Sequence, residues 1–293
     1  MTVSFYVHAG PGSAPWAMAE ALAAAVTESG ADKRRWTLID TGERPGIGAM
    51  EALASRAGDP DVLATCTPVY VQAPLLGKTQ VTHRALSPLM RLVADRYLLL
   101  GRESDGADGA SMLARIATGG TRTGGYFAGG INHLLGLAVA SAVGGATEFV
   151  LVDGEADLIP ALRDGRIDWA VATPVELATR NVDGAARPLA AIAPERLARL
   201  PDLPTLGELG VPVGFSLWRG VCAPPGLDDG AFATWRRVLD AALGTDAWRR
   251  YLAANGQVSA PLEAAPFATF LNAEEGWYRT QMAAAGVLPQ EQE

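Results

Sequence analysis

Two glycine-rich segments are the positions in this sequence best suited to chemistry. Gly10-Pro11-Gly12-Ser13 lies near the start, and Gly124-Gly125-Tyr126-Phe127-Ala128-Gly129-Gly130 lies near the middle. Each follows a strand-like run and precedes apolar residues at helical spacing. A glycine-rich turn between a strand and a helix exposes backbone N–H groups, and the helix dipole adds partial positive charge. Each turn is therefore a possible anion site, and the pair suggests two half-sites that grip one small anion across a cleft.

Further candidate ligand contacts lie beside these turns. Thr65 and Thr67 follow the third predicted strand, at the carboxyl edge where open α/β sheets bind ligands, although ordinary turn chemistry also explains them. Asp153 either caps the helix that starts near residue 156 or contacts the ligand. The rings of Trp16, Tyr126 and Phe127 could close over a flat ligand, but Trp16 could equally pack inward as the first core residue of its helix.

Signatures of catalysis are missing from the sequence. It contains no nucleophile elbow, zinc-protease helix motif, phosphate-binding lysine loop or dinucleotide-binding glycine turn. His133 is the one histidine at a glycine-rich turn, and we interpret it as a packing residue. Cys66 and Cys222 have no metal-ligand spacing, and a bridge between them is left open. We predict no catalytic residue, no metal ligand and no cofactor.

The elements that position these residues alternate between strand and helix. The first series consists of strands 2–7, 36–40 and 62–65, helices 15–29 and 49–57, and loops 42–48 and 75–88. A long apolar strand over 90–102 follows. The second series consists of helices 111–116, 132–143 and 155–163 and strands 122–126, 148–152, 167–172 and 189–193. After the second series, the sequence predicts strand 218–223 and helices 230–243, 247–255 and 266–285.

This order predicts an α/β protein with two lobes and mostly parallel sheets. We place lobe 1 at residues 1–99 and 220–293 and lobe 2 at residues 100–219, with two crossing strands as a hinge and the ligand cleft between the lobes. The chain has 293 residues, of which 49% are hydrophobic and 19% charged, as in a packed globular protein. Its formal net charge of −8 argues against nucleic-acid binding. There is no apolar run long enough to span a membrane, and we find no secretory leader, so either the chain is cytoplasmic or a leader has been removed.

An ordered series of motifs resembles one known family. The series comprises Pro11-Gly12-Ser13, Glu43-Arg44-Pro45-Gly46, Gly129-Gly130-Ile131-Asn132-His133, Leu162-Arg163-Asp164-Gly165-Arg166-Ile167-Asp168, and Leu200-Pro201-Asp202-Leu203-Pro204-Thr205 with Trp218-Arg219-Gly220. Over nearly its whole length the chain resembles the extracytoplasmic solute receptors of tripartite tricarboxylate transporters, the Bug or TctC family. The resemblance implies a type II periplasmic-binding-protein fold, a clamshell that is not an enzyme and needs no cofactor.

The resemblance also implies a ligand and partners. The ligand would be a small organic carboxylate held by backbone amides, hydroxyls and waters, and the receptor would be a periplasmic monomer that serves membrane transporter subunits. A cytoplasmic small-molecule sensor with the same fold is the alternative, and an enzyme is less favoured. Trp16 replaces an acidic residue common in the family and Tyr126-Phe127 replaces small hydroxyl residues, so we expect a less polar, aromatic carboxylate in preference to citrate. The expected ligand contacts are Gly10, Pro11, Gly12, Ser13, Trp16, Thr65, Thr67, Tyr126, Phe127, Gly129, Gly130, Asn132 and Asp153.

Overall fold

The computed structural model describes residues 2–211, 213 and 217–289, and these form two compact units. Unit 1 contains the described parts of Met1–Ala94, Trp218–Tyr278 and Pro289–Glu293, and unit 2 those of Asp95–Leu217 and Arg279–Leu288. The sequence-based lobe boundaries after residues 99 and 219 lie a few residues from these positions. Residues 279–288, which we placed in the first lobe, belong to unit 2 in the structure. Residues 290–293 of the predicted first lobe lie outside the described chain.

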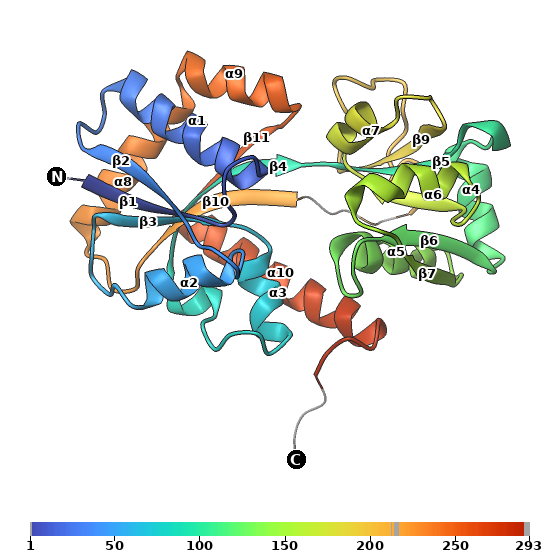
Figure 1. The fold of residues 1–293 in the computed structure, drawn as a ribbon, viewed down its shortest axis with the longest axis horizontal. Coiled ribbons are helices and arrows are strands. Elements are labelled where there is room, and N and C mark those ends of the chain that lie inside the picture. Colours follow the sequence, from blue (N-terminus) through green and yellow to red (C-terminus); the bar gives the residue numbers. More distant parts are fainter. Residues whose placement is uncertain (1, 212, 214–216, 290–293) are drawn as a thin grey trace. The chain divides into compact units, whose positions relative to one another are not determined.

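Unit 1 is built on a six-stranded mixed sheet with the order β11-β4-β10-β3-β1-β2 (Figure 1). Strands β1 (Thr2–Val7), β2 (Arg35–Asp40) and β3 (Val62–Cys66) are parallel. Strand β10 (Leu217–Ala223) runs antiparallel to β3, and β11 (Ser259–Glu263) antiparallel to β4 (Ser87–Asp95). The carboxyl ends of β1 and β3 therefore meet at the edge where the chain of β10 begins.

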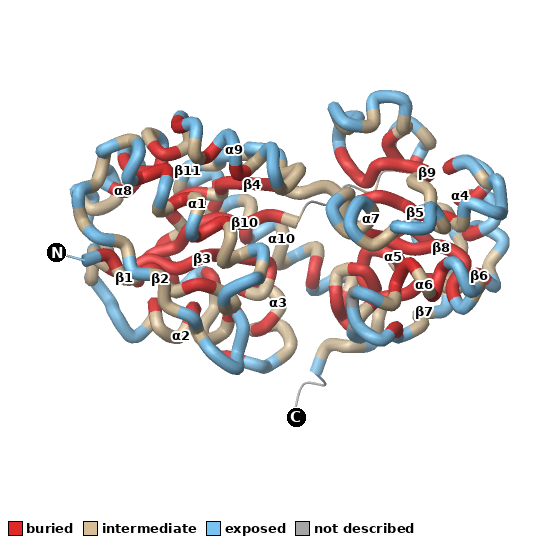
Figure 2. The backbone as a smooth tube through the Cα atoms, turned by 45° about the horizontal axis from the view of Figure 1, so that its top comes forward, coloured by how far each residue is buried: buried red, intermediate tan, exposed pale blue. Residues whose placement is uncertain are grey.

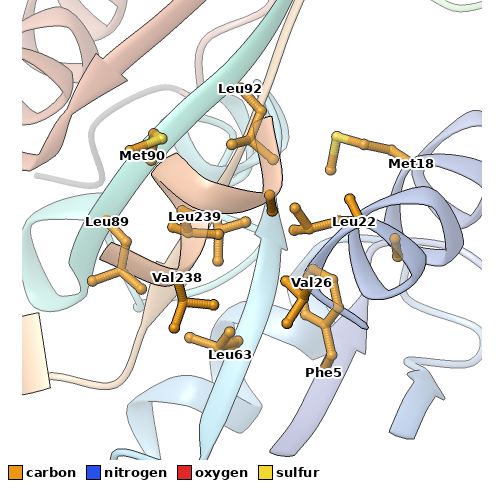
Figure 3. Packing of buried hydrophobic residues seen from close by; sticks show 14 of the residues in the cluster. Phe5, Met18, Leu22, Val26, Leu63, Leu89, Met90, Leu92, Val238 and Leu239 are labelled. Atoms are coloured by element: carbon orange, nitrogen blue, oxygen red, sulfur yellow. The ribbon is translucent and has the colours of Figure 1, made fainter. Parts of the chain in front are cut away.

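Helices cover both faces of this sheet. Helices α1 (Ala14–Ser29), α8 (Asp229–Leu243) and α9 (Asp246–Asn255) bury their apolar residues on one face, where Leu22, Val26 and Leu239 pack around Phe5 and Leu63 (Figure 3). Each such fully buried side chain contributes about 1.5–3 kcal/mol to folding. The remaining helices of this sheet are α2 (Ile47–Ala54), α3 (Val69–Leu75) and most of α10 (Ala264–Ala284).

Unit 2 is built on a five-stranded mixed sheet with the order β7-β6-β8-β5-β9. Strands β6 (Thr121–Gly125), β7 (Thr147–Leu151) and β8 (Trp169–Ala172) are parallel, and β5 (Tyr97–Arg102) runs antiparallel to β8 and to β9 (Ala186–Ile192). Every residue of β8 is buried, as Figure 2 shows in red. Helix α6 (Leu158–Arg163) packs on one face and α5 (Ile131–Ala142) on the other, and α4 (Gly109–Ala117) and α7 (Pro174–Arg180) complete the unit.

The α/β prediction is confirmed, with local corrections. The apolar run 90–102 is not one strand but the end of β4 and all of β5, which belong to different sheets because the polar pair Asp95-Arg96 interrupts it. Parallel pairing joins β1, β2 and β3 in one sheet and β6, β7 and β8 in the other, whereas the remaining strand pairings given by the described residues are antiparallel. The predicted loop 75–88 contains a 3₁₀ turn (His83–Ala85) and the start of β4. Helices α3 and α7 were not predicted because prolines, which are typical of loops, lie at their starts. Strand β11 was not predicted because it is a short strand at the edge of the sheet.

Both cysteines lie in unit 1, Cys66 on β3 and Cys222 on β10, and both are buried and free. Burial raises the pKa of the Cys66 thiol, which also hydrogen-bonds to Cys222. The Cys66 thiol therefore stays protonated, and both cysteines are small buried residues of the core. Across the described part of the chain, we find no helix that is both long and apolar enough to cross a membrane.

A buried acid of unit 1 makes stability depend on pH. The Glu274 carboxylate on α10 accepts a hydrogen bond from Trp218 Nε1 at 2.9 Å, inside an aromatic cluster with Phe267 and Phe270. Burial raises the pKa of Glu274 to about 7, although the Trp218 hydrogen bond and the charge of Arg91 act in the opposite direction. The folded state thus keeps a proton that the unfolded chain releases at lower pH.

We predict that Glu274→Gln removes this dependence. The stabilisation from protonated Glu274 is complete below pH 4.5 and is lost as the pH rises through 7. As the pH rises from 4.5 to 7, the unmodified protein should lose up to about 3 kcal/mol of unfolding free energy that the variant keeps. The difference in unfolding free energy, variant minus unmodified protein, should therefore increase by that amount. Urea unfolding across this range measures it, with the exposed Glu43→Gln as control. Parallel pH curves for Glu274→Gln and the unmodified protein would contradict the assignment.

Candidate functional site

The first glycine-rich turn joins β1 to α1 and uses several of its own hydrogen-bonding groups. Ser13 N donates to Gly10 O at 3.2 Å, and Ser13 Oγ accepts from Trp16 N at 3.2 Å and so caps α1. A Cβ atom at Gly10 would lie 2.5 Å from Asp40 Oδ2, so a side chain at this position would displace the exposed Asp40 carboxylate. Because Pro11 and Pro15 have no N–H group, the turn offers a ligand fewer backbone donors than its glycine content suggests.

His8, which the sequence reasoning missed, organises the strand ends beneath this turn. Its backbone N donates to Thr65 Oγ1 at 2.7 Å, and its ring Nδ1 lies 3.0 Å from Thr67 Oγ1. The His8 carbonyl accepts from Gly46 N at 2.8 Å. Both threonine hydroxyls are thus joined to His8, so the structure favours turn chemistry as their first role. No sequence motif marks His8, because its partners are far along the chain.

A guanidinium group lies close to this cluster. Gly220 pairs with Cys66, which places the preceding Arg219 opposite Thr67, and Arg219 is only 7% exposed. Burial lowers the pKa of His8 to about 4, and the positive charge of Arg219 contributes to the same shift. His8 is therefore neutral at physiological pH, and Arg219 supplies positive charge at the carboxyl edge of the unit 1 sheet.

Trp16 combines inward packing with an exposed hydrogen bond. Its half-buried indole packs against the core of unit 1, and its Nε1 donates to Glu20 Oε1 at 2.9 Å on the same helix. The structure thus favours the packing alternative for Trp16 over a ring that is free to cover a ligand.

The second glycine-rich turn joins β6 to α5. Gly129 has a positive φ of 79°, which favours glycine, and Gly130 is the N-cap of α5. Among the described residues, no side chain caps this helix, whose first-turn N–H groups are left to solvent or a ligand. A Cβ atom at Gly130 would lie 2.9 Å from the Phe127 ring, so a side chain at this position would displace that exposed ring.

Two polar residues at the start of α5 have structural partners. Asn132 Nδ2 donates to Val171 O at 2.7 Å and so ties α5 to β8. His133 Nδ1 accepts from Gly129 N at 2.9 Å, and its ring stacks on Phe149 with the ring centroids 3.9 Å apart. Burial lowers the pKa of His133, which keeps it neutral. The packing interpretation of His133 agrees with these contacts, and the Asn132 side chain orients the loop from below.

The two neighbouring aromatic residues of this loop differ. Tyr126 OH hydrogen-bonds to Glu176 Oε1, and Glu176 Oε2 accepts from Thr173 N at 2.6 Å within the capping box of α7. Phe127, in contrast, is 54% exposed. Tyr126 is therefore held by the β8–α7 connection, whereas Phe127 is accessible.

Asp153 does not cap a helix. The 3₁₀ turn Glu155–Asp157 starts after Gly154, and α6 starts after Asp157. Asp153 N instead donates to Asp157 Oδ2 at 3.0 Å, and the Asp153 side chain is exposed. The capping interpretation is wrong because the 3₁₀ turn separates Asp153 from the helix. Asp153 is instead an exposed acid beside the second glycine-rich turn.

The expected contacts fall into two sets. Gly10, Pro11, Gly12, Ser13, Thr65 and Thr67 lie at the carboxyl edge of the unit 1 sheet, with Trp16 on the helix that follows, and Tyr126, Phe127, Gly129, Gly130 and Asp153 lie at that of unit 2, with Asn132 on the helix that follows. A cavity of about 440 Å³ in unit 2 is lined by Asp108, Gly109 and residues 187–189 and 199–204, none of which belongs to these sets. The described residues contain no group of three or more His, Cys, Asp or Glu that could hold a metal ion.

Comparisons with known proteins place this geometry in context. The family model "Tripartite tricarboxylate transporter family receptor" matches residues 41–275. A TctC solute-binding protein from Polaromonas superposes with a TM-score of 0.85 at 19% identity, covering 97% of this chain and 98% of that one. No curated protein matches the chain.

Two similar structures contain bound acids. MatC from Rhodopseudomonas palustris, solved with malate, has a TM-score of 0.70 at 19% identity over 96% of this chain and 98% of its own. R. palustris Rpa4515, solved with adipate, has a TM-score of 0.75 at 22% identity, covering 99% of this chain and 98% of its own. These likenesses establish the two-lobed α/β fold of periplasmic solute-binding proteins.

We predict that Thr67→Val destabilises unit 1. The change leaves the His8 ring nitrogen without its hydroxyl partner in a largely buried place, at a cost of about 1–3 kcal/mol in the free energy of unfolding. Thr67→Ser keeps the hydroxyl and should recover most of this loss. Urea unfolding of both variants measures the difference, and an equal loss in the two would show that the hydroxyl contact is not the cause.

Proposed function

The chain belongs to the tripartite tricarboxylate transporter receptor family, and we propose that it binds a small organic carboxylate and presents it to membrane transporter subunits. Such a receptor acts outside the cytoplasmic membrane, so we also propose a periplasmic location. The acids named with two similar structures, malate and adipate, support this class of ligand. The family is one of transport receptors, which argues for binding without turnover.

The observation that carries the proposal is the N-terminus of α5. A helix start that no described side chain caps, preceded by Gly129 and Gly130, offers backbone donors and the positive end of a helix dipole. A carboxylate is the natural ligand for such a group of donors. Side-chain contacts within unit 2 hold the loop from beneath, so its conformation is formed before a ligand arrives.

Unit 1 contains a second candidate anion site. We propose that the turn of residues 10–13 also contacts a carboxylate, with Thr65 and Thr67 supporting that turn through His8. Arg219 adds positive charge at the same sheet edge. Because the whole chain carries a net charge of −8, an anion needs such a local attraction to overcome an unfavourable overall field.

A thermal-shift screen tests the ligand class. A ligand that binds only the folded protein stabilises it by about 2.7 kcal/mol at a hundredfold excess over its Kd. Among mono-, di- and tricarboxylates and aromatic carboxylates, we expect at least one clear rise in melting temperature, and a stronger effect from benzoate-type acids than from citrate. If dozens of carboxylates give no shift while a neutral or cationic compound does, the proposal is wrong.

Substitution of Gly130 tests the loop. In Gly130→Val the new side chain displaces the exposed Phe127 ring and stands beside the first N–H groups of α5, where it blocks the approach of an anion, so carboxylate binding should fall at least tenfold while circular dichroism stays unchanged. His133→Gln is the matched control on the same turn and should have a much smaller effect. Titration calorimetry with the strongest acid of the screen measures both. A loss of binding in His133→Gln alone would reverse these roles.

A further inference from the structure

Three exposed apolar residues of unit 2 lie at or just beyond the carboxyl ends of neighbouring strands. Phe127 is 54% exposed, Leu151 is 64% exposed and Val175 is 43% exposed. Phe127 follows β6, Leu151 ends β7 and Val175 follows β8 by three residues. We call these three residues the apolar edge. Large apolar side chains exposed singly need no explanation, but a group of them at one place on a structure is typical of a binding surface.

The sheet topology places these three residues together. Strands β7, β6 and β8 are neighbours and parallel, with Gly125 paired to Leu151 and Gly124 to Ala170. Their carboxyl ends therefore share one side of the sheet, and two inter-strand spacings give a width of about 10 Å. This is the side on which α/β sheets bind ligands, and the N-terminus of α5 starts from the same loop as Phe127.

Acidic side chains flank the apolar edge. Asp153 is exposed two residues after Leu151, and Val152 N donates to Gly125 O, which keeps this segment beside the second loop. Glu176 follows Val175 directly, and its carboxylate accepts hydrogen bonds from Tyr126 OH and Thr173 N. A negatively charged group placed on the apolar edge would be repelled from both sides. An uncharged group would meet no such opposition.

We infer that the ligand, on the function proposed above, is a monocarboxylate with an uncharged apolar body. Its carboxylate lies at the N-terminus of α5, and its body covers Phe127, Leu151 and Val175. This refines the proposed function, because it separates the ligand from polar di- and tricarboxylates. It also gives Asp153 a role in selectivity, as a residue that disfavours a second carboxylate at the far end of the ligand.

Hexanoate and adipate form the matched pair of probes. They have the same chain of six carbons and differ only in the second carboxylate of adipate. By titration calorimetry at low ionic strength, we expect hexanoate to bind the unmodified protein at least fivefold more tightly than adipate. Across butyrate, pentanoate and hexanoate, affinity should rise by up to about fourfold per methylene group as the body covers the edge.

Three variants assign the effect to residues. Phe127→Ser and Leu151→Ser should each weaken hexanoate at least fivefold and flatten the dependence on chain length. Asp153→Asn should bring the affinity for adipate within about twofold of that for hexanoate. Val182→Ser, in a residue of unit 2 that is 91% exposed and lies beyond the far end of α7, is the control and should change neither affinity. All four positions are exposed, so folding should survive, as circular dichroism can verify.

The outcomes separate this inference from the function on which it rests. If adipate binds as tightly as hexanoate and Phe127→Ser changes neither affinity, the inference is overturned while carboxylate binding stands. Equal weakening of both acids by Phe127→Ser would also overturn it, because the ring would then not distinguish an apolar end from a charged one. If no carboxylate of the thermal screen binds at all, the proposed function itself fails and the inference falls with it.

Discussion

Backbone N–H groups at the start of a buried helix need partners, and in this protein that requirement is met differently at different helices. Ser13, Asp108, Thr173, Asp228 and Thr245 each cap a helix through their side chains. Helix α5 has Gly130 at this position and no such bond among the described residues. Glycine at an N-cap costs only a few tenths of a kcal/mol relative to such a side-chain cap. Helices α2 and α6 also begin without a side-chain cap among the described residues, but α5 is the helix that follows the second glycine-rich turn, where we propose that the anion binds.

The glycines that leave α5 uncapped also permit the loop before it. Gly129 adopts a positive φ, and Gly130 passes within contact of the Phe127 ring. Beneath them, His133 and Asn132 use their polar atoms within unit 2, so they fix the loop in place. The turn of unit 1 is organised in another way, through a neutral His8 that joins two strand ends and a nearby buried Arg219. The two turns are thus alike in sequence but offer different chemistry.

Much of the fold could be predicted from the sequence because hydrophobic periodicity and glycine punctuation are local signals. The run 90–102 was misread as one strand because apolar residues lie on both sides of Asp95-Arg96, and only the pairing partners reveal two sheets. The site was predicted less well. The partners of His8 lie 57 and 59 residues away, and Tyr126 bonds to a residue 50 positions further on. Contacts of that range depend on which strands become neighbours, and no short motif encodes them. The apolar edge has the same origin, since its three members follow three different strands.

The central claim is that a carboxylate is held by the backbone N–H groups at the start of α5. Amide NMR of the ¹⁵N-labelled protein, titrated with the strongest carboxylate of the screen, tests it most directly. We expect the N–H signals of Ile131, Asn132 and His133 to shift together, with the same Kd, while signals near the cavity lined by residues 199–204 stay unchanged. Shifts at that cavity with none at the start of α5 would contradict the account.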